Sequence, residues 1–167
     1  MRLRELEEKD APYMLEWMHD DSVTHDLKTD FASKSLTDCQ NFIANSMSEA
    51  DVNYAITEDD NDEYLGTVSL KHIENGNAEF AITIRKQAMG SGVASEAMSE
   101  IFRIAFEEKG LRNVYWCVSP NNKRAVRFYD KNGYTRDCSC FEFLRGGYTP
   151  EEIPQYIWYL ERRQNTF

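Results

Sequence analysis

Two glycines stand one residue apart at the point where an apolar run gives way to a strongly helical run. The segment Gln87–Ser95 reads QAMGSGVAS, and its glycines are Gly90 and Gly92. Glycines at a helix start leave the backbone accessible, while the free N–H groups and the positive end of the helix dipole attract anions. The glycine loop (residues 87–92) is therefore typical of a phosphate or pyrophosphate site, or of a tight turn that opens a helix.

Two familiar phosphate-binding motifs do not fit this loop. A P-loop requires Lys and then Ser or Thr after its last glycine, but Val93 and Ala94 stand there. A dinucleotide-binding fingerprint requires a third glycine, and position 95 is Ser. That fingerprint also belongs to the first strand–helix turn of its domain. The sequence therefore argues against nucleoside-triphosphate hydrolysis and against a Rossmann site.

The charge balance narrows the range of partners. The 167 residues carry 19 Lys and Arg against 29 Asp and Glu, a formal net charge of −10. Such a surface repels nucleic acid and anionic membranes, and it favours cationic partners such as protonated amines. No stretch approaches the length of a membrane span, and the first residues lack the apolar core of a signal peptide. We expect no nucleic-acid partner, no membrane association and a cytoplasmic location.

The four cysteines are expected to be reduced thiols. Cys138 and Cys140 lie two residues apart, a spacing that differs from the usual paired zinc ligands. On a strand they would point to the same face, so they could form half of a metal site. Packing is the preferred interpretation, and we expect no metal.

The hydrophobic pattern predicts one α/β domain over residues 1–167, built on a mixed sheet. Asp10 and Ser35 are expected to cap the first two helices, and Asn75-Gly76 is a strong hairpin signal. The expected strands cover residues 1–6, 52–57, 63–73, 74–84, 113–119, 134–144 and 155–162. The expected helices cover residues 11–21, 36–50, 90–109 and 121–132.

The chain resembles the GNAT superfamily of acetyl-CoA-dependent N-acetyltransferases. Their acetyl-CoA signature is Q/R-x-x-G-x-G/A, and Gln87, Gly90 and Gly92 fill it. After the next strand these proteins often carry N-x-x-A-x-x-x-Y and then K-x-G-F/Y. This second pattern is filled by Asn122, Ala125, Tyr129, Lys131, Gly133 and Tyr134.

The order of the elements fits as well, so the resemblance covers nearly the whole chain. It implies the GNAT fold, a mostly antiparallel sheet of about seven strands flanked by about four helices. The phrase VASEAM after the glycines, together with the strand GNAEFAI, looks most like the branch that acetylates ribosomal-protein N-termini. Similar sequences in that branch act on amino sugars, polyamines and other small amines.

The resemblance implies that the glycine loop holds the pyrophosphate of acetyl-CoA. It assigns to this cosubstrate the end of the preceding strand, the loop, the start of the following helix and the cap of the next helix. These residues are Ile84, Gln87, Met89, Gly90, Ser91, Gly92, Val93, Ala94 and Asn122. Lys123 and Arg127 could meet the 3′-phosphate, with a solvated helix face as the alternative.

Acetyl transfer to an amine requires that the amine lose a proton and that the leaving thiolate gain one. Tyr129 occupies the family's position for the acid, with aromatic packing as the alternative. Glu79 matches an acidic residue in the equivalent strand and is the candidate base, with a purely structural carboxylate as the alternative. His72 and water are further candidates for the base, and His25 could help to recognise the acceptor.

The expected function is therefore transfer of an acetyl group from acetyl-CoA to a primary amine. The acceptor would be a small amine, an amino sugar or a peptide or protein N-terminus, approaching from the first two helices and residues 143–155. Two alternatives remain: a non-catalytic acyl-CoA-binding or regulatory module of the same fold, and a plain interaction domain. We expect a monomer or a homodimer.

Overall fold

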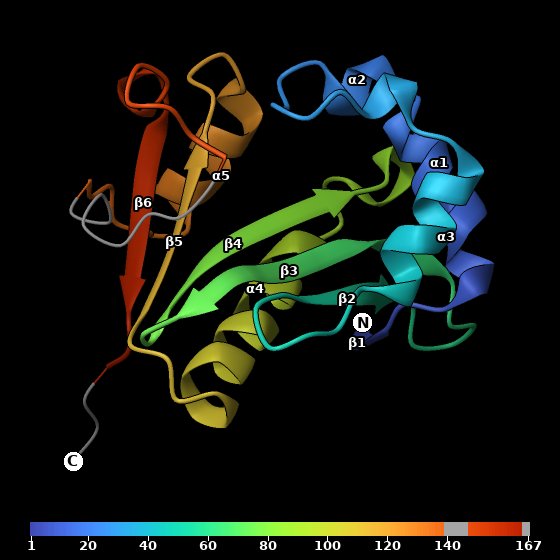
Figure 1. Ribbon diagram of the computed structural model, residues 1–167, viewed down its shortest axis with the longest axis horizontal. Helices are drawn as coiled ribbons and strands as arrows, with labels where there is room; N and C mark the ends of the chain where they lie inside the picture. Colours follow the sequence, from blue (N-terminus) through green and yellow to red (C-terminus); the bar gives the residue numbers. More distant parts are fainter. Residues whose placement is uncertain (139–146, 165–167) are drawn as a thin grey trace.

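The computed structural model describes residues 1–138 and 147–164, and one sheet forms its centre (Figure 1). In the described residues the sheet has six strands in the order β1-β2-β3-β4-β5-β6. Neighbours are antiparallel except for the parallel pair β4 and β5. The strands are β1 (Arg2–Glu5), β2 (Val52–Thr57), β3 (Tyr64–Glu74), β4 (Asn77–Ile84), β5 (Asn113–Val118) and β6 (Ile157–Arg162).

Four longer helices and several short turns surround the sheet. The helices are α1 (Ala11–Met18), the single turn α2 (Asp21–Thr24), α3 (Leu36–Ala44), α4 (Val93–Arg103) and α5 (Lys123–Lys131). A π-helical segment, η4 (Ile104–Glu108), continues α4. The 3-10 turns are η1 (Glu8–Asp10), η2 (Phe31–Ser33), η3 (Lys86–Ala88) and η6 (Ile153–Gln155). No helix within the described residues is both long and apolar enough to cross a bilayer.

The hairpin turn and one of the two helix caps predicted from the sequence are present. Asn75 and Gly76 have φ of 53° and 80°, the left-handed pair that a tight hairpin turn requires, and Glu74 pairs with Asn77 across the turn. Ser35 caps α3, because its side chain accepts the backbone N–H of Asp38. The predicted hairpin and the predicted cap are confirmed.

The expected boundaries need three corrections. In the described residues the sheet has six strands where about seven were expected. The described part of residues 134–144 makes only an isolated bridge from Arg136 to Tyr159, and residues 139–146 lie outside the described range. The second helix ends at Ala44 and not at residue 50, because the following residues turn back and Met47 pairs with Val52. The first helix ends at Met18, before the new turn α2.

The side chain of Asp10 binds Arg4 and does not cap α1 as expected. It precedes α1, but its side chain makes no capping bond to that helix. Its buried carboxylate instead binds the Arg4 guanidinium at 2.8 and 2.9 Å and accepts the backbone N–H of Glu7 at 2.8 Å. The Arg4 guanidinium competes with the backbone N–H groups of α1 for the Asp10 carboxylate. The bidentate pair with Arg4 forms in place of the capping bond.

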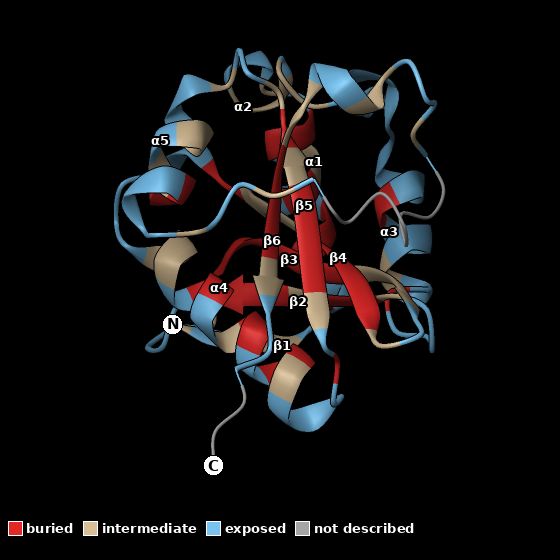
Figure 2. Ribbon diagram, turned by 90° about the vertical axis from the view of Figure 1, so that its left-hand side faces the viewer, coloured by how far each residue is buried: buried red, intermediate tan, exposed pale blue. Residues whose placement is uncertain are grey.

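Helices cover both faces of the sheet (Figure 2). The main core lies between β2–β5, α4 and α5, and it includes Val68, Phe80, Ile101 and Trp116. A second cluster packs α1 and α3 on the other face through Met14, Trp17, Cys39 and Ala55. Successive residues of a strand point to opposite faces of the sheet, which separates the two clusters.

Gly66 marks the tightest contact between β3 and β4. A Cβ at this position would press on the carbonyl oxygen of Thr83 and lie 3.1 Å from the Cα of Ile84. Both obstacles are backbone, so neither can rotate away. We expect Gly66→Ala to lower the free energy of unfolding by about 1–3 kcal/mol, the usual cost of overpacking. Urea denaturation measures this, and a loss below about 0.5 kcal/mol would contradict it.

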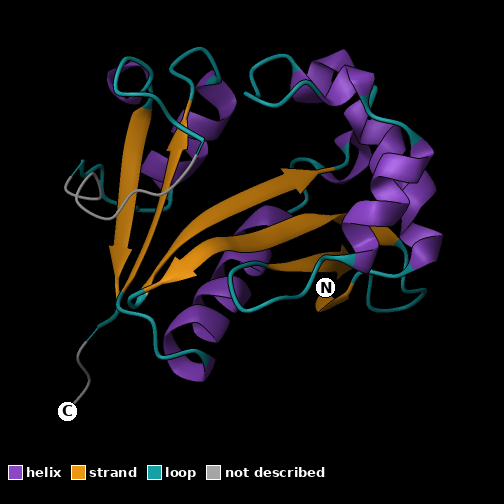
Figure 3. Cartoon of the chain, in the orientation of Figure 1, coloured by secondary structure: helices purple, strands orange, loops and turns teal. Residues whose placement is uncertain are grey.

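Beyond its first residues β4 leaves β5. The two strands pair only at Asn77–Asn113, Ala78–Val114 and Glu79–Tyr115. From there β4 runs toward α1 while β5 runs toward α5, as the diverging arrows in Figure 3 show. The edge of β4 after Glu79 that faces β5 therefore has no strand partner among the described residues.

Candidate active site

The glycine loop connects the far end of β4 to the first turn of α4. Gly90 and Gly92 have φ of 79° and 85°, in the left-handed region that glycine adopts without strain. Gly92 is the N-cap of α4, and a Cβ added to it would meet nothing within 4 Å. The N–H groups of the first turn of α4, including those of Val93 and Ala94, have no acceptors within the helix. The loop thus offers backbone donors and open space to an anion.

A cation from another helix reaches the same loop. A Cβ added to Gly90 would lie 3.7 Å from Nη2 of Arg124, in the first turn of α5. The guanidinium therefore adds positive charge beside the donors of α4, in the fork geometry that suits phosphate. The sequence pattern pointed to Lys123 and Arg127 on this helix but not to Arg124. All three side chains are exposed.

Ion pairs and hydrogen bonds connect the loop to α1. Arg85, at the end of β4, binds Glu16 of α1 at 3.0 Å and Glu63 at 3.1 Å, and its guanidinium lies 4.7 Å from the ring centre of Tyr13. Gln87 donates its amide to the same Glu16 carboxylate at 3.2 Å. The loop therefore has a fixed position relative to the sheet, and Gln87 is one of the residues that fix it.

The remaining residues assigned to acetyl-CoA lie in or near the loop, and each makes contacts within the protein. Ser91 donates its hydroxyl to the carbonyl of Ala88. Asn122 is the N-cap of α5 and accepts the N–H of Ala125 at 3.3 Å. Met89 has an extended backbone at the end of η3, and Ile84 ends β4 with its side chain in the main core. Their contacts with a cosubstrate stay a prediction.

Tyr129 projects from α5 into the aromatic part of the main core. Its ring centre lies 5.5 Å from that of Trp116 and 5.1 Å from that of Tyr159, and the residue is only 8% exposed. Its hydroxyl makes no hydrogen bond with a described residue. Burial raises the pKa of the phenol above its ordinary value, so Tyr129 holds its proton at neutral pH.

Glu79 lies at the last paired position before β4 and β5 separate. It is 3% exposed, and its Oε2 accepts the hydroxyl of Tyr148 at 2.8 Å. Its Oε1 lies 3.7 Å from Nε2 of His72. The thiol of Cys117 donates to the Tyr148 hydroxyl at 3.4 Å. The two candidate bases of the sequence analysis thus belong to one cluster.

The candidate acid and the candidate base sit on opposite faces of β5. Trp116 contacts Tyr129 in the main core, whereas its neighbours Tyr115 and Cys117 belong to a third cluster with Tyr148. Tyr115 is also the partner of Glu79 in the sheet. The two candidate groups therefore flank the place where β4 and β5 part.

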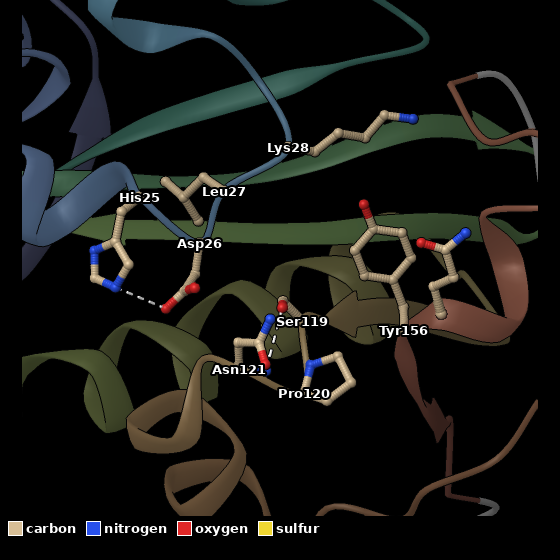
Figure 4. A pocket seen from close by; sticks show the side chains of 9 residues that line it. His25, Asp26, Leu27, Lys28, Ser119, Pro120, Asn121 and Tyr156 are labelled. Atoms are coloured by element: carbon tan, nitrogen blue, oxygen red, sulfur yellow. Dashed lines mark hydrogen bonds and ion pairs between the residues drawn. The ribbon is translucent and has the colours of Figure 1, made fainter.

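A pocket of about 340 Å³ opens between the loop after α2, the loop after β5 and the residues just before β6 (Figure 4). His25 sits at its edge, with Nε2 3.0 Å from Asp26 and Nδ1 2.8 Å from the carbonyl of Asp21. That carbonyl, and then the Asp26 carboxylate, raise the pKa of His25. The lining residues are His25, Asp26, Leu27, Lys28, Ser119, Pro120, Asn121, Gln155 and Tyr156.

Lys28 links the two walls of this pocket. Its ammonium binds Glu152 at 2.6 Å and the carbonyl of Gly147, and it lies 4.7 Å from the ring centre of Tyr148. Residues 147–152 therefore meet the loop after α2, and the approach of an acceptor from this side stays a prediction. In the described residues no group of three or more His, Cys, Asp and Glu side chains could hold a metal, and Cys140 lies outside them.

Comparison with known protein families shows which family the chain belongs to. The model of the acetyltransferase (GNAT) domain matches residues 1–135. The chain belongs to the GNAT acetyltransferase family. The match includes the glycine loop, Glu79 and Tyr129, so the family resemblance drawn from the sequence motifs is confirmed.

Individual GNAT relatives agree in length and fold. An uncharacterized N-acetyltransferase, p20, from Bacillus licheniformis is 28% identical over 147 residues, covering 82% of this chain and 83% of that protein. The GNAT-family acetyltransferase of Bacillus anthracis superposes with a TM-score of 0.75 at 20% identity, covering 96% of this chain and 93% of that one. Spermidine N-acetyltransferase from Vibrio cholerae, in complex with CoA and spermine, gives a TM-score of 0.78 at 19% identity, covering 97% and 95%. These structures confirm the GNAT fold.

Proposed function

We propose that this GNAT protein transfers the acetyl group of acetyl-CoA to a primary amine. One observation carries the proposal: β4 and β5 separate after Glu79, and the glycine loop with the N-terminus of α4 lies at the end of the separated strand. The V. cholerae relative of the same fold binds CoA, which supports a CoA thioester as the donor.

The residues present fit acetyl-CoA. Gly90 and Gly92 leave the backbone accessible, the first turn of α4 offers N–H donors, and Arg124 adds a guanidinium. The unpaired edge of β4, which ends at Ile84, offers N–H and C=O groups to an extended amide-bearing chain such as pantetheine. The bound thioester supplies an activated acetyl group. The side chains of this protein remove the proton from the amine and donate a proton to the leaving thiolate.

Tyr129 is the proposed acid. Its hydroxyl keeps its proton, because burial raises its pKa, and it makes no hydrogen bond with a described residue that would compete. It can therefore donate to the sulfur as the C–S bond breaks and negative charge develops there. The amine nitrogen forms the new C–N bond as the C–S bond breaks, and the thiolate leaves as a thiol with the Tyr129 proton. Tyr129 then regains a proton from solvent before the next turnover.

Glu79 is the proposed base. Its carboxylate is buried next to the strand separation and is held by Tyr148, so it lies in a fixed orientation beside the reacting groups. It removes the proton that the amine must lose, directly or through one water molecule. The pocket with Asp26 and Tyr156 is the proposed entry of the acceptor, and the acidic surface favours amines that arrive protonated.

The proposal is tested by binding and turnover together. Acetyl-CoA should raise the melting temperature of the protein, because only the folded chain presents the loop. A screen of acetyl-CoA turnover over polyamines, amino sugars, amino acids and short peptides should then identify the acceptor. No stabilisation at saturating acetyl-CoA would overturn the proposal. Stabilisation without turnover across the whole screen would favour the non-catalytic acyl-CoA-binding module.

Glu79→Gln separates a base from a structural carboxylate. The amide keeps the shape and still accepts the Tyr148 hydroxyl, but it cannot take up the proton. We expect a lower kcat/KM and the loss of one ionisation from the acidic limb of its pH profile. A structural Glu79 would instead lower the melting temperature and leave the form of the profile unchanged.

The matched control is Glu161→Gln on β6. Glu161 is also partly buried, and burial raises the pKa of its carboxyl, but it pairs with Val114, whose side chain lies in the main core, on the face of the sheet opposite to Glu79. This variant should keep the wild-type pH profile. If both variants alter the acidic limb alike, the effect does not belong to Glu79.

A further inference from the structure

The buried carboxylate of Glu79 meets a histidine that a regular strand would turn away from it. The register pairs Lys71 of β3 with Glu79 of β4, so these two side chains share a face of the sheet. His72 is the next residue, and in an unbroken strand it would point to the opposite face. Its Nε2 nevertheless lies 3.7 Å from Oε1 of Glu79.

A bulge in β3 produces this contact. The register shifts between Lys71 and Glu74, and His72 has φ of 53° in the left-handed region. That conformation is unfavourable for a residue with a Cβ, and such strain gathers at functional sites. The carboxylate of Asp51 holds the bulge by accepting the backbone N–H of His72 at 3.0 Å.

We propose that His72 is the proton outlet of Glu79 during acetyl transfer, an inference that rests on the proposed function. Glu79 takes the proton that the acceptor amine releases and passes it from Oε1 to Nε2 of the neutral His72 imidazole. This transfer returns Glu79 to the carboxylate. The imidazolium then releases a proton to water, and His72 returns to its neutral form. His72 acts through Glu79 and does not touch the acceptor.

The burial of the two side chains explains the need for an outlet. The side chain of Glu79 is 4% exposed, whereas that of His72 is 38% exposed. A carboxylate so enclosed cannot hand its proton to bulk water directly, and the half-exposed imidazole can. The separation of 3.7 Å is longer than a hydrogen bond, and a small rotation of the ring or one bridging water closes it.

Tyr148 fixes which oxygen faces the histidine. Its hydroxyl donates to Oε2 of Glu79 at 2.8 Å, which leaves Oε1 toward His72. Burial and the Glu79 charge raise the pKa of Tyr148, so it remains a donor at neutral pH. It therefore orients the carboxylate.

Other titratable and charged groups surround this pair. Lys71 lies opposite Glu79 on β3, and the Lys28 ammonium lies over the Tyr148 ring. Burial raises the pKa of Cys117, which donates to Tyr148, to about 11. The side chain of Asp51 accepts the backbone N–H of His72. Of these side-chain types, imidazole is the one that exchanges protons readily near neutral pH.

His72→Gly tests the outlet, because glycine suits the left-handed backbone and keeps the N–H that Asp51 binds. With an amine that wild type acetylates, we expect kcat to fall about tenfold, below the range for a group that acts directly on the substrate. KM for acetyl-CoA should be unchanged, and the melting temperature should equal or exceed that of wild type. Added imidazole should restore most of the lost kcat. His19→Gly, at an exposed histidine, should change neither kcat nor its response to imidazole.

A double variant tests the route through Glu79. If the proton leaves through both residues in series, His72→Gly should lower kcat no further once Glu79→Gln is present. Three results would overturn the outlet: a His72→Gly kcat within twofold of wild type, a loss that imidazole does not restore, or additive losses in the double variant. Absence of wild-type turnover over the acceptor screen would overturn the proposed function, and the outlet with it.

Discussion

Gly92→Asp should abolish the rise in melting temperature that acetyl-CoA produces in the wild type. Gly92 caps α4 with φ of 85°, and space beyond its Cα is open, so a side chain there would enter the region that the loop offers to an anion. The added carboxylate also places negative charge against the pyrophosphate at the positive end of the helix. Steric and electrostatic effects act in the same direction, so we expect no detectable shift at acetyl-CoA concentrations that saturate wild type.

Gly110→Asp is the matched control. Gly110 has φ of 65° and also meets nothing within 4 Å, but it follows the far end of the same helical segment. Both variants force a side chain into a left-handed backbone, which costs about 1–2 kcal/mol. Gly110→Asp should therefore lose stability and keep the acetyl-CoA shift. Retention of the shift by Gly92→Asp would remove the glycine loop from the proposed site.

Tyr129→Phe should lower turnover by roughly ten- to a thousand-fold, a range that overlaps general acid catalysis. Affinity for acetyl-CoA should hardly change, because the ring and its contacts with Trp116 and Tyr159 remain. The Tyr129 hydroxyl makes no hydrogen bond with a described residue, so we expect a change in unfolding free energy within about 0.5 kcal/mol. Steady-state kinetics and denaturation together measure the two effects.

Tyr159→Phe, in the same aromatic cluster, should lower the stability of the protein and not its turnover. The Tyr159 hydroxyl donates to Asp130 at 2.9 Å, so its removal should cost about 0.5–1.5 kcal/mol of stability. Turnover should stay near wild type. Unaltered turnover in Tyr129→Phe, with the chemical step shown to limit the rate, would leave Tyr129 as a packing residue.

Local chemistry in the sequence was enough for most of the secondary structure. The Asn75-Gly76 turn and the Ser35 cap depend on residues within a few positions of one another, and both formed as expected. The end of the second helix was missed, because the chain turns back after Ala44 and Met47 forms a bridge with Val52. Asp10 does occupy the N-cap position of α1, but its carboxylate binds Arg4 of the preceding strand β1 and makes no capping bond to the helix.

For the site, the sequence by itself determined the glycine loop, the family and the identities of Glu79 and Tyr129 as candidates. These follow from residue types at fixed spacings. Only the tertiary structure decided which side chains meet. Arg124 reaches the loop because α5 packs beside it, and Tyr148 reaches Glu79 across 69 residues of sequence.

His72 shows the difference most clearly. Strand alternation, the rule that a sequence supports, would place it on the opposite face from Glu79. The bulge held by Asp51 reverses that placement and brings the two side chains together. A single left-handed residue changes which face a side chain occupies, and the contacts that sustain it come from a loop 21 residues away in the chain.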